Sequence, residues 1–226
     1  MFLPLHDQNP IRYVRFPYVA YGLIGLNVLV FLVQLATPGG FDWLPVEYGM
    51  IPLVVRDVVP QPVAWLPDWA NLVTYAFLHA DWLHLLSNML FLWIFGDNIE
   101  DAMGHLKFLV FYLCCAVLAA LTHLAFNIDG NGPLIGASGA VAGVMGAYIM
   151  LYPHARVFVL FRIVVPIPLP VPALWMLGVW IATQLFYVLI GSEEPVAWWA
   201  HLGGVVAGAL LAIPFRRQDV PLFGGR

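Results

Sequence analysis

The sequence predicts an all-α polytopic membrane protein in which six transmembrane helices form one bundle. Composition gives the class, because 62% of the 226 residues are apolar and only 10% are charged, whereas about 25% of residues are charged in soluble domains. The second observation is a series of apolar runs. Their lengths are near the roughly 20 residues that a helix needs to cross about 30 Å of hydrocarbon.

Six candidate spans follow from these runs. The first is too long for a removable signal peptide and lacks a small-residue cleavage site, so we expect a retained helix. The fourth is short, since about 15 residues rise only roughly 22 Å, and one of its ends should begin below the membrane surface in a cavity lined by protein. The spans are 17–36, 82–103, 106–126, 138–152, 173–190 and 197–215.

The basic residues indicate the orientation. Six spans place both termini and the second and fourth connections on one side, and that side holds eight of the nine Lys and Arg residues. Because cytoplasmic loops are enriched in Lys and Arg, both termini are predicted to be cytoplasmic, so Ser138 opens its helix from the outer side. The eight are Arg12, Arg15, Lys107, Arg156, Arg162, Arg216, Arg217 and Arg226; Arg56 lies opposite.

Composition also marks the segments outside the spans. The connection 37–81 is rich in Pro, Trp and acidic residues, which favours folded structure in the outer membrane interface. The connection 153–172 contains five prolines, which argue against a helix there and favour an interfacial or extended segment. We expect a cytoplasmic lead over 1–16, one membrane domain over 17–215 and a cytoplasmic tail over 216–226.

Ser138 is the first residue with possible chemistry. It opens the fourth span between Ala137 and Gly139, and a helix N-terminus offers backbone N–H groups and a positive dipole end to a developing oxyanion. A serine hydroxyl is a weak nucleophile until a base takes its proton. The alternative is a small residue that only packs against a neighbouring helix.

His201 lies in the apolar sixth span, where an ionisable group is costly and usually functional. Gly204 and Gly208 follow it on one helical face, and Gly139, Gly143 and Gly146 are similarly spaced on the fourth span. Glycines at this spacing allow close helix contact. The two smooth faces should therefore pack together and bring the imidazole beside the serine hydroxyl; the alternative is a buried histidine that serves packing alone.

The second span begins near His79 and contains His84 and Asn88, which are four residues apart and share a helical face. Their N–H donors could complete an oxyanion hole with the Ser138 backbone. A zinc site is the competing interpretation of these histidines. Their spacing is not that of the H-E-x-x-H zinc motif, and no nearby carboxylate is spaced as a zinc ligand, so we expect no metal.

The other polar residues within the spans are expected to be structural. Glu100 and Asp101 lie at the cytoplasmic end of the second span, where a tie to a loop or a helix end is favoured. Three amides within the spans are expected to form hydrogen bonds that pack helices together, namely Asn27, Gln34 and Gln184.

Three motifs taken together resemble the rhomboid intramembrane serine proteases. They are Gly136-Ala-Ser138-Gly, Ala200-His201-x-x-Gly204-x-x-x-Gly208 and Phe77-Leu-His79-x4-His84-x3-Asn88. They lie in the fourth, sixth and second spans, and the resemblance covers roughly residues 69–212 and, by position, the first span. It implies a six-transmembrane-helix rhomboid-like bundle with residues 37–81 as a membrane-embedded first loop.

The resemblance implies a serine–histidine dyad without an acidic third member. Ser138 would be the nucleophile and His201 the general base and then acid. His84 and Asn88 would stabilise the oxyanion together with the Ser138 backbone, and Gly136 would shape that loop.

The resemblance also implies roles for surrounding segments. Glu100 and Gly104 would belong to a structural motif, residues 191–197 would cap the active site, and substrate would enter beside the fifth span. Two positions depart from many rhomboid-like proteins: Ala142 stands where some carry an aromatic stacked on the histidine, and Ala70-Asn71 where many carry Trp-Arg.

We therefore expect an intramembrane serine endopeptidase that cleaves transmembrane segments of membrane proteins. Its partners would be transmembrane protein substrates and the lipid bilayer, with no cofactor; the net charge of −4 gives no support for nucleic acid. The alternative is a non-catalytic rhomboid-like protein that binds membrane-protein clients. No transit peptide is evident, so the expected location is a bacterial inner membrane.

Overall fold

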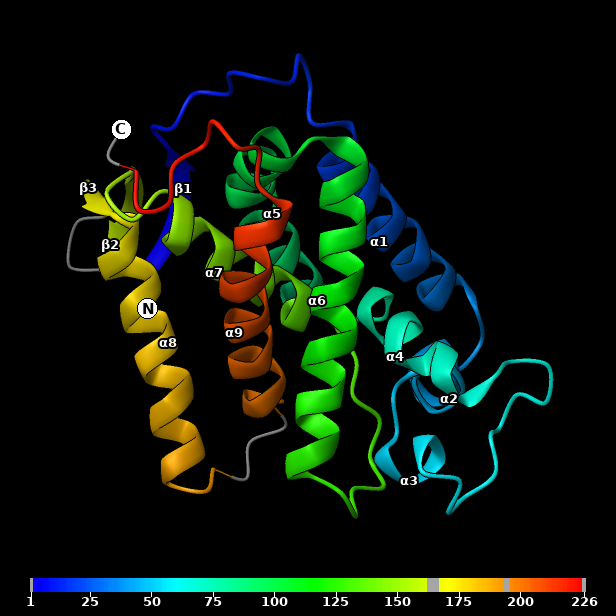
Figure 1. Ribbon diagram of the computed structural model, residues 1–226. Coiled ribbons are helices and arrows are strands. Elements are labelled where there is room, and N and C mark those ends of the chain that lie inside the picture. Colours follow the sequence, from blue (N-terminus) through cyan, green and yellow to red (C-terminus); the bar gives the residue numbers. More distant parts are fainter. Residues whose placement is uncertain (1, 162–166, 193–195, 225–226) are drawn as a thin grey trace.

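Six long helices dominate the computed structural model, which describes residues 2–161, 167–192 and 196–224 (Figure 1). Each begins and ends within one residue of a predicted span. Three of them, α1, α6 and α9, are long and apolar enough to cross a membrane, while α7 and α8 are shorter apolar helices. The six are α1 Tyr18–Ala36, α5 Trp82–Met103, α6 His105–Phe126, α7 Ser138–Leu151, α8 Ala173–Leu189 and α9 Trp198–Phe215.

The prediction that the chain is all-α was wrong, because three strands form an antiparallel sheet in the order β1-β2-β3. The strands are β1 Phe2–Asp7, β2 Arg156–Phe161 and β3 Ile167–Pro172. Val157 and Val159 of the central strand are fully buried, as suits β-branched residues. The prolines of 153–172 exclude a helix as expected, and those at 168 and 170 lie on edge strand β3, where a missing N–H is tolerated.

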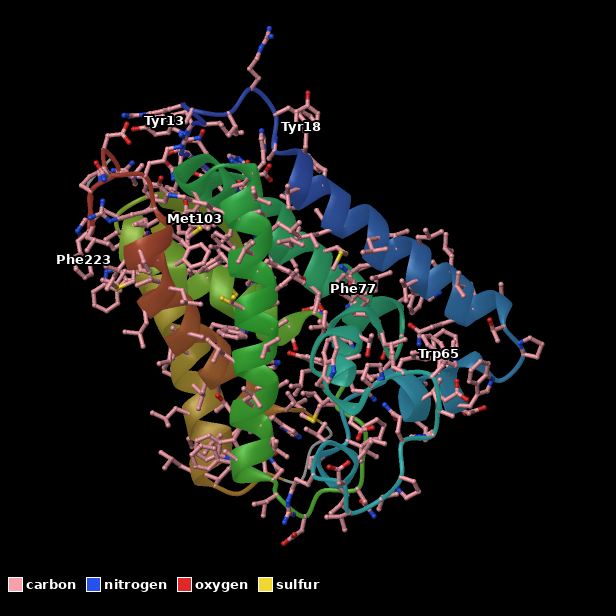
Figure 2. The ribbon with its side chains drawn as sticks, turned by 45° about the vertical axis from the view of Figure 1, so that its right-hand side comes forward. Tyr13, Tyr18, Trp65, Phe77, Met103 and Phe223 are labelled. Atoms are coloured by element: carbon pink, nitrogen blue, oxygen red, sulfur yellow. The ribbon has the colours of Figure 1, made fainter. Side chains whose placement is uncertain are left out.

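The connection 37–81 is folded, as predicted, and lies opposite the sheet (Figure 1). Its elements are α2 Gly40–Tyr48, α3 Pro52–Val55, η1 Asp68–Ala70, α4 Asn71–Thr74 and η2 Tyr75–Phe77. Asn71 holds it together, since its Nδ2 donates to the carbonyl of Gly49 at 2.7 Å and its Oδ1 accepts from Gln61 at 2.9 Å. Trp65 lies on this connection (Figure 2), and the residue is 73% exposed.

Helix α7 is the centre of the bundle and packs backbone to backbone against α9, as the glycine spacing predicted. A Cβ on Gly204 would lie 2.1 Å from the carbonyl oxygen of Gly139, and one on Gly208 would lie 1.8 Å from that of Gly143. Real Cβ atoms do not come this close, so only glycine fits at both positions.

Two buried carboxylates close the end of the bundle that carries the N-terminal lead. Glu100 accepts from the N–H groups of Val19 at 3.0 Å and Ala20 at 2.7 Å, which caps the start of α1. Asp101 accepts from three successive N–H groups of the lead, those of Arg12, Tyr13 and Val14. Tyr13 and Tyr18 accordingly lie near Met103 at this end (Figure 2). The structural roles expected for the two acidic residues are confirmed.

Asp7, at the end of β1, ties the sheet to the bundle. Its Oδ2 accepts from the hydroxyl of Tyr148 on α7 at 2.5 Å. Burial, with a smaller contribution from the nearby Asp97 carboxylate, raises the pKa of Asp7 from 3.8 to about 6.

The α7–α9 contact predicts that Gly208→Ala destabilises the protein strongly. The added methyl must push the helices apart, and overpacking costs about 1–3 kcal/mol or more, so the Tm in detergent should fall by about 5 °C or more. Gly25→Ala in α1 is the matched control, since a Cβ there meets nothing within 4 Å. Equal Tm values for the two variants would contradict this packing.

The raised pKa of Asp7 predicts a pH-dependent contribution to stability. A carboxyl whose pKa rises on folding contributes fully below 3.8, and the contribution is lost as the pH rises through about 6. The Tm of the wild type relative to Asp7→Asn should therefore fall between about pH 4 and about pH 7. Parallel Tm-against-pH curves for the two proteins would show that Asp7 is not buried in this way.

Candidate active site

Ser138 and His201 meet where α7 and α9 begin to pack. Ser138 is the first residue of α7, and its Oγ lies 2.8 Å from Nε2 of His201, which is largely buried in the first turn of α9. The structure thus shows the juxtaposition that the glycine faces predicted. A hydroxyl hydrogen-bonded to an imidazole nitrogen is the arrangement that activates a serine for attack.

The loop before Ser138 holds α7 in an unusual position. In Figure 1 the chain leaves the lower end of α6 and turns back into the bundle before α7 begins. Gly136 has a φ of +113°, which side chains rarely adopt, and its N–H donates to the carbonyl of Tyr75 at 2.9 Å. Ala137 offers no capping side chain, so the N–H groups of the first turn of α7 stay available to a ligand.

His84 and Asn88 lie beside this loop, as expected. The N–H of Ala80 donates to Nδ1 of His84 at 3.3 Å, which places the proton of a neutral ring on Nε2. That edge of the ring faces Gly136, because a Cβ on Gly136 would lie 2.6 Å from Nε2. Asn88 uses its Nδ2 to donate to the carbonyl of His84 at 3.0 Å.

A cavity of about 410 Å³ brings these residues together. Its polar lining comprises Asp81, His84, Ser87, Asn88, Ser138 and His201, and apolar side chains such as Phe91 and Met145 line the rest. An apolar pocket with a few convergent polar groups is typical of a binding or catalytic site.

Gln184 and Trp180 on α8 are the neighbours of His201 that the sequence did not indicate. We expected Gln184 only to pack helices, yet its Oε1 lies 2.7 Å from Nδ1 of His201. The Trp180 ring lies 5.6 Å from the imidazole, so α8 supplies the aromatic that Ala142 does not. The sequence feature that could have indicated them is their separation of four residues, which places Trp180 and Gln184 on one face of α8.

His79 stays outside this cavity lining. It is fully buried, and in the described part of the chain neither of its ring nitrogens has a hydrogen-bond partner. Its ring meets that of His84 edge-on at 5.0 Å. Among the described residues, no three His, Cys, Asp or Glu side chains gather as metal ligands.

The predicted cap, residues 191–197, is described only at its ends, since residues 193–195 lie outside the described residues. Val196 and Ala197 line the cavity, which places the end of this segment beside Ser138 and His201.

The comparisons with known proteins all indicate the same family. Residues 67–218 match the family model of the rhomboid domain. Rhomboid protein 1, mitochondrial, of Saccharomyces cerevisiae is 30% identical over 202 residues, which cover 85% of this chain and 51% of the yeast protein. Rhomboid protease AarA of Providencia stuartii is 26% identical over 211 residues, with 85% of this chain and 70% of that protein covered.

A plant relative extends the comparison. RHOMBOID-like protein 12, mitochondrial, of Arabidopsis thaliana is 32% identical over 156 residues, which cover 62% of this chain and 44% of the plant protein. The chain thus spans about half the length of these mitochondrial relatives. Because the domain match covers more than half of this chain, the protein is a multi-pass membrane protein that belongs to the rhomboid family of intramembrane proteases.

Proposed function

We propose that this chain is a serine endopeptidase that cleaves transmembrane segments of membrane proteins with a Ser138–His201 dyad. The observation that carries the proposal is the 2.8 Å contact between Ser138 Oγ and His201 Nε2 on the wall of a cavity. Homology to rhomboid proteases supports the same reaction class.

The dyad supplies both proton transfers of the reaction. Nε2 of His201 takes the hydroxyl proton as Oγ of Ser138 attacks the substrate carbonyl, and Nε2–H then protonates the leaving amine. The resulting acyl-enzyme is hydrolysed by water, which His201 deprotonates in the same way.

The residues around the loop would stabilise the charge that develops on the carbonyl oxygen. The Ser138 N–H lies at the positive end of the α7 dipole, and Nε2–H of His84 faces the same loop. Asn88 adds an amide nitrogen with a second N–H. Donors arranged before the reaction stabilise an oxyanion without reorganising, which is the largest contribution in many acyl transfers.

The substrate would be a helix that loses its regular hydrogen bonds at the cavity. A transmembrane helix satisfies its own carbonyls, so the scissile peptide must unwind locally before Ser138 can reach it. Helix-breaking residues near the cut therefore favour cleavage, and the α7–α9 glycines leave backbone rather than bulky side chains near the dyad.

We further propose that the six helices of the bundle lie in a bacterial inner membrane, with α7 beginning below the outer membrane surface, residues 17–215 as the membrane domain and both termini in the cytoplasm. The lead, the sheet and the C-terminal tail lie at one end of the bundle, and the 37–81 connection lies at the other (Figure 1). Arg12, whose backbone N–H donates to the Asp101 carboxylate, and Arg217, whose Nε donates to the Asp101 carbonyl oxygen, both lie at the first end, which agrees with cytoplasmic enrichment of basic residues.

Replacing the hydroxyl tests the proposal. In proteoliposomes, Ser138→Ala should lower cleavage of a transmembrane substrate by about 10³-fold or more, as read by product bands over time. The wild type should also react with a fluorophosphonate probe, and Ser138→Ala should not. A wild type that binds a transmembrane segment without cleaving it or labelling would establish the non-catalytic alternative.

Gly136→Ala should lower kcat by about 100-fold, the usual effect of disturbing one oxyanion donor. The methyl would meet the His84 ring at 2.6 Å, at a φ that alanine resists. Gly132→Ala in the same loop is the matched control, since a Cβ there meets nothing within 4 Å. Equal kcat values for both variants would remove Gly136 and His84 from the proposed oxyanion site.

A further inference from the structure

Gln184 makes a directed set of hydrogen bonds in the buried space between α8 and α9. Its Nε2 lies 3.2 Å from the carbonyl oxygen of Trp180 on its own helix and 3.4 Å from the hydroxyl of Thr183. Its Oε1 lies 2.7 Å from Nδ1 of His201, and the side chain is 5% exposed. The amide therefore joins the backbone of α8 to the imidazole.

This geometry fixes which way the amide points. With Nε2 toward Trp180, an N–H group meets a carbonyl oxygen, which can only accept. The flipped amide would set Oε1 against that carbonyl, acceptor against acceptor, in a buried place where an unpaired polar group costs about 1–3 kcal/mol. Oε1 must then face His201.

The tautomer of His201 follows. An amide oxygen only accepts, so Nδ1 of the ring has to carry a hydrogen in order to bond Gln184. The neutral ring then has its lone pair on Nε2, which is the nitrogen 2.8 Å from Ser138 Oγ. This is the one neutral form of His201 that can take the serine proton.

We propose that Gln184 is a positioning residue that holds His201 in the Nδ1–H tautomer and in the plane needed to reach Ser138. It occupies the place of the carboxylate in a serine–histidine–aspartate triad but brings no charge. The inference rests on the proposed protease function and adds a third member, from α8, to the Ser138–His201 dyad.

A charge on residue 184 should affect the protonation of His201, because few charged groups of the described chain face its imidazole. Among the described residues, His84 from α5 and His123 from α6 are its titratable neighbours, and Asp81 lies on the same cavity wall. The contacts from α7 and α8, Ser138 and Gln184, are neutral. Within the part of the chain that the structure describes, a carboxylate at 184 would be the first anion in direct contact with the ring.

The second half of α8 meets α9 at Gln184, which contacts His201, and at Tyr187, whose ring stacks on that of Trp198 with the centroids 4.5 Å apart. The buried residues of α8 are Ala173, Met176 and Leu177 in its first turns, and then Gln184 alone.

Gln184→Leu and Gln184→Glu test the proposal through cleavage kinetics against pH. Gln184→Leu should lower kcat by about 10- to 100-fold with little change in KM, because a small misplacement of a catalytic group costs up to about 100-fold. Gln184→Glu should keep more of the kcat and move the acid limb of the kcat/KM profile to higher pH, because a carboxylate favours the imidazolium. Leu185→Ala, on the adjacent exposed position of α8, should leave kcat and the profile unchanged.

A second readout does not depend on turnover. Imidazole ¹⁵N spectra of histidine-labelled protein, with His201 assigned by the loss of its signals in His201→Ala, should show a protonated Nδ1 in the wild type and a mixture of tautomers in Gln184→Leu. A wild-type kcat for Gln184→Leu, a Gln184→Glu profile that superimposes on the wild type, or a protonated Nε2 in the wild type would overturn the role of Gln184. Equal cleavage by wild type and Ser138→Ala would instead overturn the protease function itself.

Discussion

Along the seam between α7 and α9, the two helix backbones touch, with Gly204 against Gly139 and Gly208 against Gly143. A serine side chain ends one bond beyond Cβ, so a histidine reaches it at 2.8 Å only when the helices lie this close. Lipid tails are as apolar as the side chains, so burial of apolar surface does not hold the helices together; van der Waals packing does. The glycines are therefore what sets both the fold and the distance between hydroxyl and imidazole.

Several polar groups elsewhere in the bundle hold one segment to another. Glu100 accepts hydrogen bonds from backbone N–H groups at the start of α1, and Asp101 accepts one from the backbone of the lead. Gln34 forms hydrogen bonds with both the N–H and the carbonyl of His79. In each pairing the polar group serves to hold the backbone of another segment. The groups around Ser138 differ, because Ser138 at the N-terminus of α7 and the nearby His84 line the cavity.

The helices could be predicted to within a residue because apolar run length and charged or proline-rich borders specify them. The approach of His201 to Ser138 could be predicted as well, since the small-residue spacing appears on both helices. The sheet could not, because β1 and β2 pair across about 150 residues and the prolines of β3 argue against a strand interior. Gln184 was missed for another reason: which face of an almost wholly apolar helix turns inward depends on tertiary packing.

The loop that presents Ser138 is fastened from outside the bundle. Leu134 exchanges two backbone hydrogen bonds with Met50 at 2.8 and 3.0 Å, and Gly136 donates to Tyr75, so two points of the 37–81 connection anchor it. That connection is accessible at Trp65. A ligand that binds this outer surface and displaces the connection would disturb the loop at Gly136, beside the proposed oxyanion site, without competing for the cavity.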